Sequence, residues 1–163
     1  MSERLSVGIA QFEVAEPPQR LVTYGLGSCV AITLYDAERR IGGLAHTLLP
    51  TVEQAVDPRR PTKFVDAAIR TMRAELVARG AVQERLVAKI FGGANMFEPL
   101  LGVSENGIGA RNIRSARETL DDLAIPLQAE DVGGNFGRTL EFDLASGRVR
   151  VRVVRGREGE LFF

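Results

Sequence analysis

Two apolar segments on either side of a short polar stretch constrain the fold of this chain most. Residues 29–36 and 41–48 are rich in β-branched and aliphatic side chains, and the residues between them, beginning with Ala37 and Glu38, favour a tight turn. This arrangement predicts a β-hairpin. The first predicted strand starts at Cys29, the only cysteine of the chain, and the second contains His46, its only histidine. The geometry of the hairpin therefore decides whether thiol and imidazole meet.

Strand register predicts that they do. If the hairpin turns about Ala37–Glu38, Leu34 lies opposite Ile41 and Cys29 lies opposite His46. Directly opposed residues of antiparallel strands have Cβ atoms about 4.5–5.5 Å apart, so sulfur and ring nitrogen come within hydrogen-bonding reach. A slip of one residue would place them on opposite faces of the sheet. Taken singly, a free cysteine is usually a small buried hydrophobe and a lone histidine an ordinary core or surface residue, so only their pairing predicts a reactive site.

The remaining pattern predicts an α/β fold in one domain, residues 1–163. Short apolar runs predict strands, and two segments with apolar residues at helical spacing are ended by Gly80 and Pro126. The strands are expected at 5–14, 21–24, 86–91, 127–132, 139–144 and 149–154, and the helices at about 62–80 and 108–123. Because helices and strands do not alternate throughout, we predict a mixed, largely antiparallel sheet sandwich covered by two main helices.

The composition argues against several classes of function. Lys and Arg number 21 and are balanced by 21 Asp and Glu, so no net field attracts a nucleic acid. No apolar run approaches the roughly 20 residues that cross a bilayer, and the N-terminus lacks the pattern of a signal peptide, so a cytoplasmic location is expected. One cysteine and one histidine do not suffice for a zinc site. The glycine-rich stretches 92–95 and 133–137 lack phosphate-loop spacing and are expected to be turns, so we expect neither metal nor cofactor.

The residues before Cys29 suit the presentation of a nucleophile. Glycines in the stretch 25–28 admit positive φ, and backbone N–H groups around Gly27 and Ser28 can point at a developing oxyanion. An adjacent imidazole can accept the thiol proton and return it to a leaving amine. A third group normally orients the base, and the sequence leaves both Asp36 and Asp131 open for this role.

Arginines recur on two predicted surfaces. One group lies on the second helix and the other on one face of the final predicted strand: Arg111, Arg114 and Arg117, then Arg148, Arg150 and Arg152. Solvated faces explain both groups most simply. A docking surface for an acidic protein is the alternative.

Two blocks of the sequence resemble the CheD family of chemoreceptor glutamine deamidases. They are Thr23-Tyr24-Gly25-Leu26-Gly27-Ser28-Cys29-Val30 and Gly43-Leu44-Ala45-His46-Thr47-Leu48-Leu49-Pro50. Further similarity in Phe91-Gly92-Gly93-Ala94, in 131–135 and in Gly137-Arg138 extends the resemblance over most of the chain. Leu48 departs from the methionine of the family, a difference that concerns packing.

The resemblance implies a fold similar to the catalytic domain of cytotoxic necrotizing factor toxins and a thiol mechanism. Cys29 would be the nucleophile, His46 the base and Thr23 the hydrogen-bond acceptor that orients the imidazole, with Gly27 and Ser28 in the oxyanion and substrate loop. A side-chain amide of a chemoreceptor, a methyl-accepting chemotaxis protein, would be converted from glutamine to glutamate, and methyl-ester hydrolysis is also implied.

The same resemblance implies two partners. The helical bundle of the receptor's cytoplasmic part would enter a groove flanked by loops such as 92–101. The chemotaxis phosphatase CheC is the second implied partner. A regulatory role in binding CheC, with little catalysis, is the alternative to an enzyme.

Overall fold

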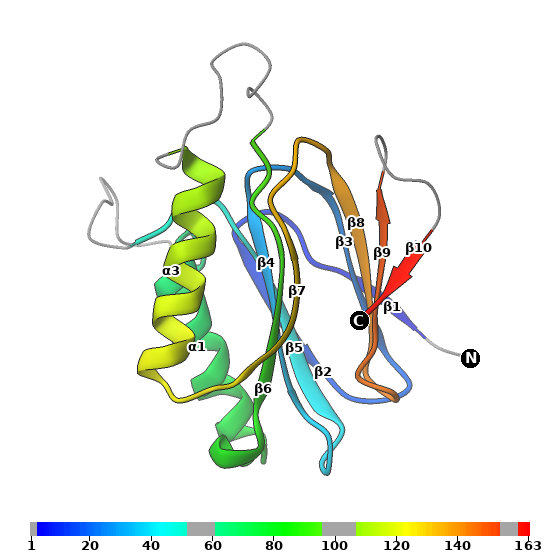
Figure 1. Ribbon diagram of the computed structural model, residues 1–163. Coiled ribbons are helices and arrows are strands. Elements are labelled where there is room, and N and C mark those ends of the chain that lie inside the picture. Colours follow the sequence, from blue (N-terminus) through cyan, green and yellow to red (C-terminus); the bar gives the residue numbers. More distant parts are fainter. Residues whose placement is uncertain (1–2, 52–60, 96–106, 154–159) are drawn as a thin grey trace.

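Three layers build the protein, as the computed structural model shows (Figure 1). Two helices form one outer layer, and two five-stranded sheets form the middle layer and the other outer layer. The structure describes residues 3–51, 61–95, 107–153 and 160–163. In these ranges no helix is long and apolar enough to cross a membrane.

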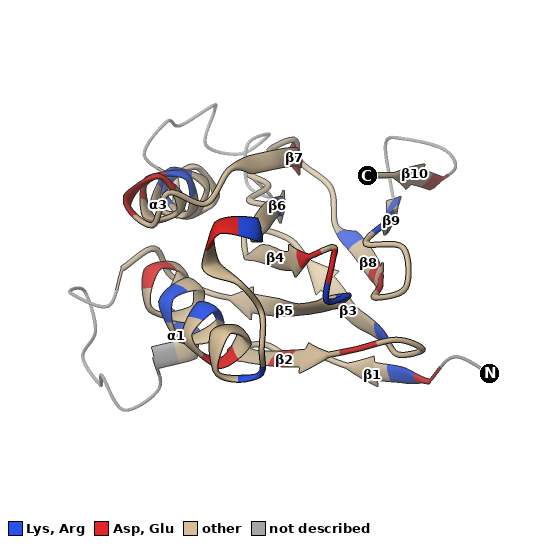
Figure 2. Cartoon of the chain, turned by 90° about the horizontal axis from the view of Figure 1, so that it is seen from below, with Lys and Arg blue, Asp and Glu red and all other residues tan. Residues whose placement is uncertain are grey.

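The middle layer, sheet B, carries the hairpin. Its strands in spatial order are β2 (Gln11–Ala15), β5 (Ile41–Thr47), β4 (Val30–Asp36), β6 (Val87–Gly92) and β7 (Leu127–Val132). All seven residues of β4 and all seven of β5 are buried, because the helices cover one face and the second sheet covers the other. Figure 2 shows the consequence for charge, since the two strands are uncharged apart from Asp36 at the end of β4.

The outer layer, sheet A, consists of β1 (Arg4–Ser6), β3 (Arg20–Leu26), β8 (Arg138–Asp143), β9 (Val149–Val153) and β10 (Glu160–Phe162), in that order. Among the described strands, only β1 with β3 and, in sheet B, β6 with β7 pair in parallel. The prediction of a mixed, largely antiparallel sandwich with two main helices is therefore confirmed. The predicted strand 5–14 is in fact two strands in different sheets, and Ala10, with φ 63°, lies where the chain passes between them.

The two main helices lie on the face of sheet B that is turned away from sheet A. They are α1 (Val65–Ala78), preceded by a 3₁₀ turn (Pro61–Lys63), and α3 (Ile108–Asp122), and a second 3₁₀ turn (Gln83–Arg85) precedes β6. Helix α1 buries Val65, Ala68, Ile69, Met72 and Leu76 at the spacing of one helical stripe. A second apolar cluster fills the space between the two sheets. That inter-sheet space receives the side chains considered below.

The hairpin forms, but its register differs from the prediction. Ala31, and not Cys29, lies opposite His46. The difference is two residues, and side chains alternate between faces with a period of two. Cys29 directly precedes β4 and packs against the cluster between the two sheets, on the side of sheet B that His46 faces, but the two residues are not opposed.

Turn chemistry explains the shift. The Asp36 carboxylate accepts hydrogen bonds from the N–H groups of Glu38 at 3.1 Å and Arg39 at 3.3 Å. Aspartate favours such turns because its side chain bonds the backbone two residues on. The turn consequently spans 37–40 in place of the predicted two-residue turn.

Candidate active site

A threonine of sheet A and the histidine of sheet B meet between the two sheets. Thr23 Oγ1 lies 2.7 Å from His46 Nδ1, and both side chains are fully buried. The same hydroxyl donates a hydrogen bond to the carbonyl oxygen of Val7, at 2.8 Å. The contact therefore joins β3, β5 and the segment between β1 and β2.

This geometry fixes the tautomer of the imidazole. A threonine hydroxyl has one proton, and here the proton points at the Val7 carbonyl oxygen. Thr23 Oγ1 must therefore accept the second hydrogen bond, which places a proton on His46 Nδ1. The lone pair is left on Nε2, which is buried and has no hydrogen-bond partner among the described residues. No described group donates a proton to Nε2, so this nitrogen can accept one from another molecule or group.

Cys29 borders the same inter-sheet space. The residue is partly exposed, and it packs against the apolar cluster between the sheets that includes Leu26, Ala31 and Phe91. A β-bulge interrupts β3 between Thr23 and Leu26, and Gly25 within it has φ 67°. Bulges of this kind commonly redirect strands next to active sites. The bulge leads the chain from the Thr23 hydroxyl into the loop that ends at Cys29.

The glycine stretch 92–95 supports that loop. The N–H of Gly93 donates to the carbonyl oxygen of Cys29 at 2.8 Å, and the N–H of Ala94 donates to that of Gly27 at 2.9 Å. Gly92 has φ 99°, and a Cβ on it would lie 2.3 Å from the Cys29 carbonyl oxygen, so only glycine fits. The stretch was predicted to be a turn, but Gly92 ends β6 and 93–95 continue as irregular chain. Its hydrogen bonds hold the backbone of the cysteine loop. Residues 96–101, the rest of the expected groove loop, lie outside the described residues.

The stretch 133–137 extends this support. The N–H of Gly133 donates to the carbonyl oxygen of Gly92, and that of Asn95 donates to the carbonyl oxygen of Gly134, both at 2.8 Å. Three glycine-rich segments far apart in the sequence thus meet at one end of sheet B, beside Cys29.

Burial keeps both candidate reactive groups uncharged at rest. It raises the pKa of the Cys29 thiol, an effect that the residue's own backbone N–H opposes. Burial also lowers the pKa of His46. Since both shifts favour the neutral forms, the ground state is a thiol with a neutral imidazole. Within the described ranges, no three His, Cys, Asp or Glu side chains come together as ligands for a metal ion.

The two aspartates that the sequence left open as orienting groups have other partners. Asp36 accepts two hydrogen bonds from one edge of the Arg85 guanidinium, with Nε–Oδ1 and Nη2–Oδ2 distances of 3.0 Å. Burial would raise the pKa of Asp36, but the Arg85 hydrogen bonds and backbone N–H groups outweigh it and lower that pKa to about 2. Asp131 pairs with buried Arg138 at 3.2 Å. Neither is the group that contacts the imidazole.

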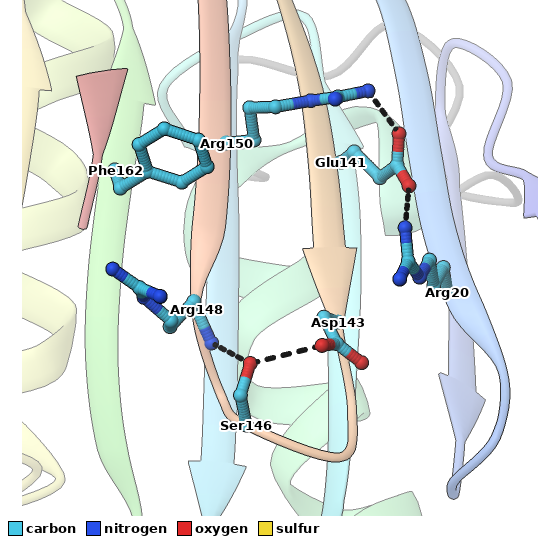
Figure 3. A pocket seen from close by; sticks show the side chains of 7 residues that line it. All are labelled: Arg20, Glu141, Asp143, Ser146, Arg148, Arg150 and Phe162. Atoms are coloured by element: carbon cyan, nitrogen blue, oxygen red, sulfur yellow. Dashed lines mark hydrogen bonds and ion pairs between the residues drawn. The ribbon is translucent and has the colours of Figure 1, made fainter. Parts of the chain in front are cut away.

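The arginines of β9 belong to the opposite surface of sheet A. Glu141 pairs with Arg20 Nη1 at 2.8 Å and with Arg150 Nη2 at 2.7 Å, and the Arg148 guanidinium lies over the Phe162 ring at 5.3 Å. These side chains surround a hollow of about 230 Å³ (Figure 3). The internal pairing of Arg20 and Arg150 agrees with a solvated face. This hollow is not part of the inter-sheet site.

Sequence reasoning missed one buried side chain at the site, Asn112 of α3. Its Nδ2 donates to the carbonyl oxygens of Ser28 at 2.9 Å and Leu48 at 3.1 Å. The available signal was an amide side chain on the helical stripe that also carries Ala116 and Leu120. A polar residue on an apolar stripe needs a buried partner.

Comparisons with known proteins identify relatives of this chain. The profile of the family described as "CheD chemotactic sensory transduction" matches residues 48–153. A Geobacter metallireducens protein named "Probable chemoreceptor glutamine deamidase CheD 2" is 53% identical over 156 residues, which cover 95% of this chain and 96% of the relative.

Two further relatives, from distant organisms, carry the name "Probable chemoreceptor glutamine deamidase CheD". The Moorella thermoacetica protein is 52% identical over 153 residues, covering 93% of this chain and 92% of the relative. The Pyrococcus abyssi protein is 44% identical over 156 residues, covering 96% of this chain and 95% of the relative. With a matching family profile and relatives of this identity over nearly their full length, the chain belongs to the CheD family.

Proposed function

We propose that this protein deamidates glutamine side chains of chemoreceptors, with Cys29 as nucleophile, His46 as general base and Thr23 as the group that orients the imidazole. The names of the relatives supply the substrate class. The observation that carries the mechanism is the Thr23–His46 hydrogen bond, because it leaves Nε2 unprotonated on the sheet face that Cys29 shares.

The chemistry follows from these positions. His46 Nε2 removes the Cys29 thiol proton, and the sulfur forms a bond to the amide carbon of the substrate. The tetrahedral intermediate collapses when the imidazolium protonates the leaving nitrogen, so the C–N bond breaks and ammonia departs. Water, activated by the same Nε2, then hydrolyses the thioester and releases glutamate and the free thiol. Each proton that His46 accepts is returned within the cycle.

Backbone N–H groups of the cysteine loop supply the oxyanion donors in this proposal. The carbonyl oxygens of Gly27, Ser28 and Cys29 all accept hydrogen bonds from the supporting segments. In a planar trans peptide the C=O and the following N–H point in opposite directions. The N–H groups of Ser28 and Cys29 are thus turned away from the support. There they can meet the oxygen of a tetrahedral intermediate.

The same acyl-enzyme chemistry accommodates a glutamate methyl ester, with methanol as leaving group in place of ammonia.

The decisive experiment incubates a purified receptor cytoplasmic domain, in unmethylated and methylated form, with wild type or Cys29→Ala, and follows receptor peptides by mass spectrometry. Replacing an amide by an acid adds about 1 Da to a glutamine peptide. A gain that depends on Cys29 supports the proposal, and an equal peptide pattern with both proteins would overturn it.

A further inference from the structure

We propose that Asn112 is a positioning residue that sets the orientation of the Ser28–Cys29 peptide, and with it the Cys29 N–H, relative to the strand that carries His46. The inference rests on the proposed deamidase function. Asn112 touches neither the thiol nor the imidazole in the described contacts, and acts through the backbone of both segments.

The amide group of Asn112 spans the two segments that carry the reactive residues. One hydrogen bond from Nδ2 reaches the carbonyl oxygen of Ser28, next to Cys29, and the other reaches that of Leu48, just beyond β5. A carboxamide nitrogen has two protons, so both are used. The two acceptors also fix which end of the amide is nitrogen, since the oxygen in that place would face two carbonyl oxygens.

The side chain is held rigidly in place by its helix. Asn112 is fully buried. Helix α3 lies close to the glycine stretch 92–95. A Cβ on Gly109, one turn before Asn112, would lie 2.4 Å from the carbonyl oxygen of Gly93. Glycine at position 109 thus permits the approach that brings Asn112 to the cysteine loop. One turn later, Ser115 Oγ donates to the carbonyl oxygen of Pro50 at 2.5 Å.

The consequence for catalysis concerns one peptide plane. With the Ser28 carbonyl oxygen bound by Asn112, the Cys29 N–H must point the opposite way. Gly93 and Ala94 hold the adjoining Cys29 and Gly27 carbonyl groups, but only the Asn112 bond holds the peptide between Ser28 and Cys29 in the described contacts. Without that bond the peptide can rotate, and the Cys29 N–H loses its aim at the oxyanion.

The cost of Asn112 supports a dedicated role. Its Oδ1 is buried without a hydrogen-bond partner among the described residues. An unsatisfied buried acceptor destabilises a protein, so an apolar residue would be the simpler choice for packing alone. The bridge to Ser28 and Leu48 gives a reason for an amide at this position.

Two reactions of the same thiol separate an effect on the oxyanion from an effect on the nucleophile. Deamidation passes through a tetrahedral oxyanion, whereas alkylation of Cys29 by iodoacetamide forms none. Asn112→Leu keeps a similar volume and removes both donors. We expect kcat for deamidation of the receptor domain to fall about 10- to 100-fold. This is less than the roughly 100- to 1,000-fold for outright loss of one oxyanion donor, because the Cys29 N–H is misaimed and not removed. KM should stay within about threefold and the alkylation rate within about twofold.

Ser115→Ala is the matched control, since it removes a hydrogen bond from the same helix face to the segment after β5 but leaves Ser28 untouched. Its kcat should stay within about threefold of wild type. Asn112→Ala also removes both donors, and it replaces Asn112→Leu if that variant does not fold.

The proposal is overturned if the Asn112 variants deamidate at the wild-type rate, if deamidation and alkylation fall in parallel, or if Ser115→Ala loses as much activity. Failure of the deamidase function itself is distinguishable, because wild-type protein would then release no ammonia from the receptor domain.

Discussion

Removing the Thr23 hydroxyl should impair catalysis in protein that is still folded. Thr23→Val keeps the shape of a buried side chain and deletes two hydrogen bonds, the 2.7 Å contact with His46 Nδ1 and the 2.8 Å bond to the Val7 carbonyl oxygen. Both partners are left unsatisfied, and each costs about 1–3 kcal/mol, together about 2–6 kcal/mol. In a domain of this size, that loss lowers the melting temperature by about 4–24 °C, so the activity of the variant is measured below its own unfolding midpoint.

Apart from this loss of stability, the barrier of the reaction rises, because the imidazole that carries the His46 Nδ1–H becomes charged in the transition state. Hydrogen bonds to ionised groups are about twice as strong as neutral ones. The charge-assisted contact therefore lowers the barrier by roughly 1.5–3 kcal/mol, and this is lost in Thr23→Val. At 1.36 kcal/mol for each factor of ten, kcat/KM should fall about 10- to 100-fold. Without its acceptor the imidazolium is less stable, and the acid limb of the pH profile should move to lower pH.

The assay measures ammonia release and glutamine-to-glutamate conversion on a receptor cytoplasmic domain, together with thermal unfolding. Thr47→Val is the control, since Thr47 is also fully buried and its hydroxyl donates to the Val30 carbonyl oxygen at 2.8 Å without touching the imidazole. It should lose about 1–3 kcal/mol of stability, since one buried acceptor is left unsatisfied, but stay within about threefold of wild-type activity. Equal activity losses in the two variants, or an unchanged pH profile in Thr23→Val, would refute the orienting role.

Four further outcomes follow from the site and its support. Because burial lowers the pKa of His46, the acid limb of kcat/KM should have its midpoint below the ordinary value of 6.5, and a midpoint above 6.5 would contradict a buried neutral base. Alkylation of Cys29 in wild type should have a pH midpoint above the ordinary thiol value of 9.0, since burial raises its pKa; a midpoint near 7 would indicate a preformed thiolate. The pKa of the Asp36 carboxyl is 3.8 in the unfolded chain and about 2 in the folded protein, so its charge stabilises the protein by about 2 kcal/mol above pH 3.8. This contribution is lost as the pH falls to about 2. Asp36→Asn should therefore unfold at lower urea concentration than wild type at pH 7, and the difference should shrink near pH 2. Gly92→Ala places a Cβ 2.3 Å from the Cys29 carbonyl oxygen, so it should lower both the melting temperature and deamidation, and a wild-type result in both would show that the loop moves aside without cost.

Local patterns predicted most of the secondary structure because they depend on neighbouring residues. Strand 127–132 and the helix beginning at Ile108 lie where the periodicity places them. The short strand β10 was missed, since three residues carry too little pattern to predict a strand. The division into two sheets also escaped prediction. Alternation along a strand tells which side chains share a face, but not which strands lie beside it.

The site shows the same limit. The hairpin rested on a guessed turn, and the Asp36 side chain changed its length by bonding to Glu38 and Arg39. The shared face of Cys29 and His46 survived only because the shift was an even number of residues. Thr23 came from family resemblance alone, since its partner is in the other sheet and no local spacing relates positions 23 and 46.

The three candidate residues come from both sheets and meet in the buried space between them. This burial explains why a neutral hydroxyl, and not a carboxylate, contacts the imidazole. Thr23 comes from sheet A, while His46 and Cys29 belong to sheet B and its loop. A carboxylate in place of the hydroxyl would have to remain charged in the dry space between the sheets, at a high desolvation cost. A neutral hydroxyl avoids that cost and still fixes the tautomer, because the Val7 carbonyl oxygen takes its only proton.

Burial also implies that the thiol becomes reactive only when substrate is bound. With burial favouring neutral thiol and neutral imidazole, the thiolate needs the oxyanion donors and an amide carbon in place before its formation is useful. A resting thiol of this kind resists oxidation, which selects thiolates. In the proposed mechanism, burial therefore holds Cys29 unreactive, and one hydrogen bond across the sheets orients His46 as the base. Catalysis should accordingly respond to contacts at the inter-sheet layer more than to the surface charges around it.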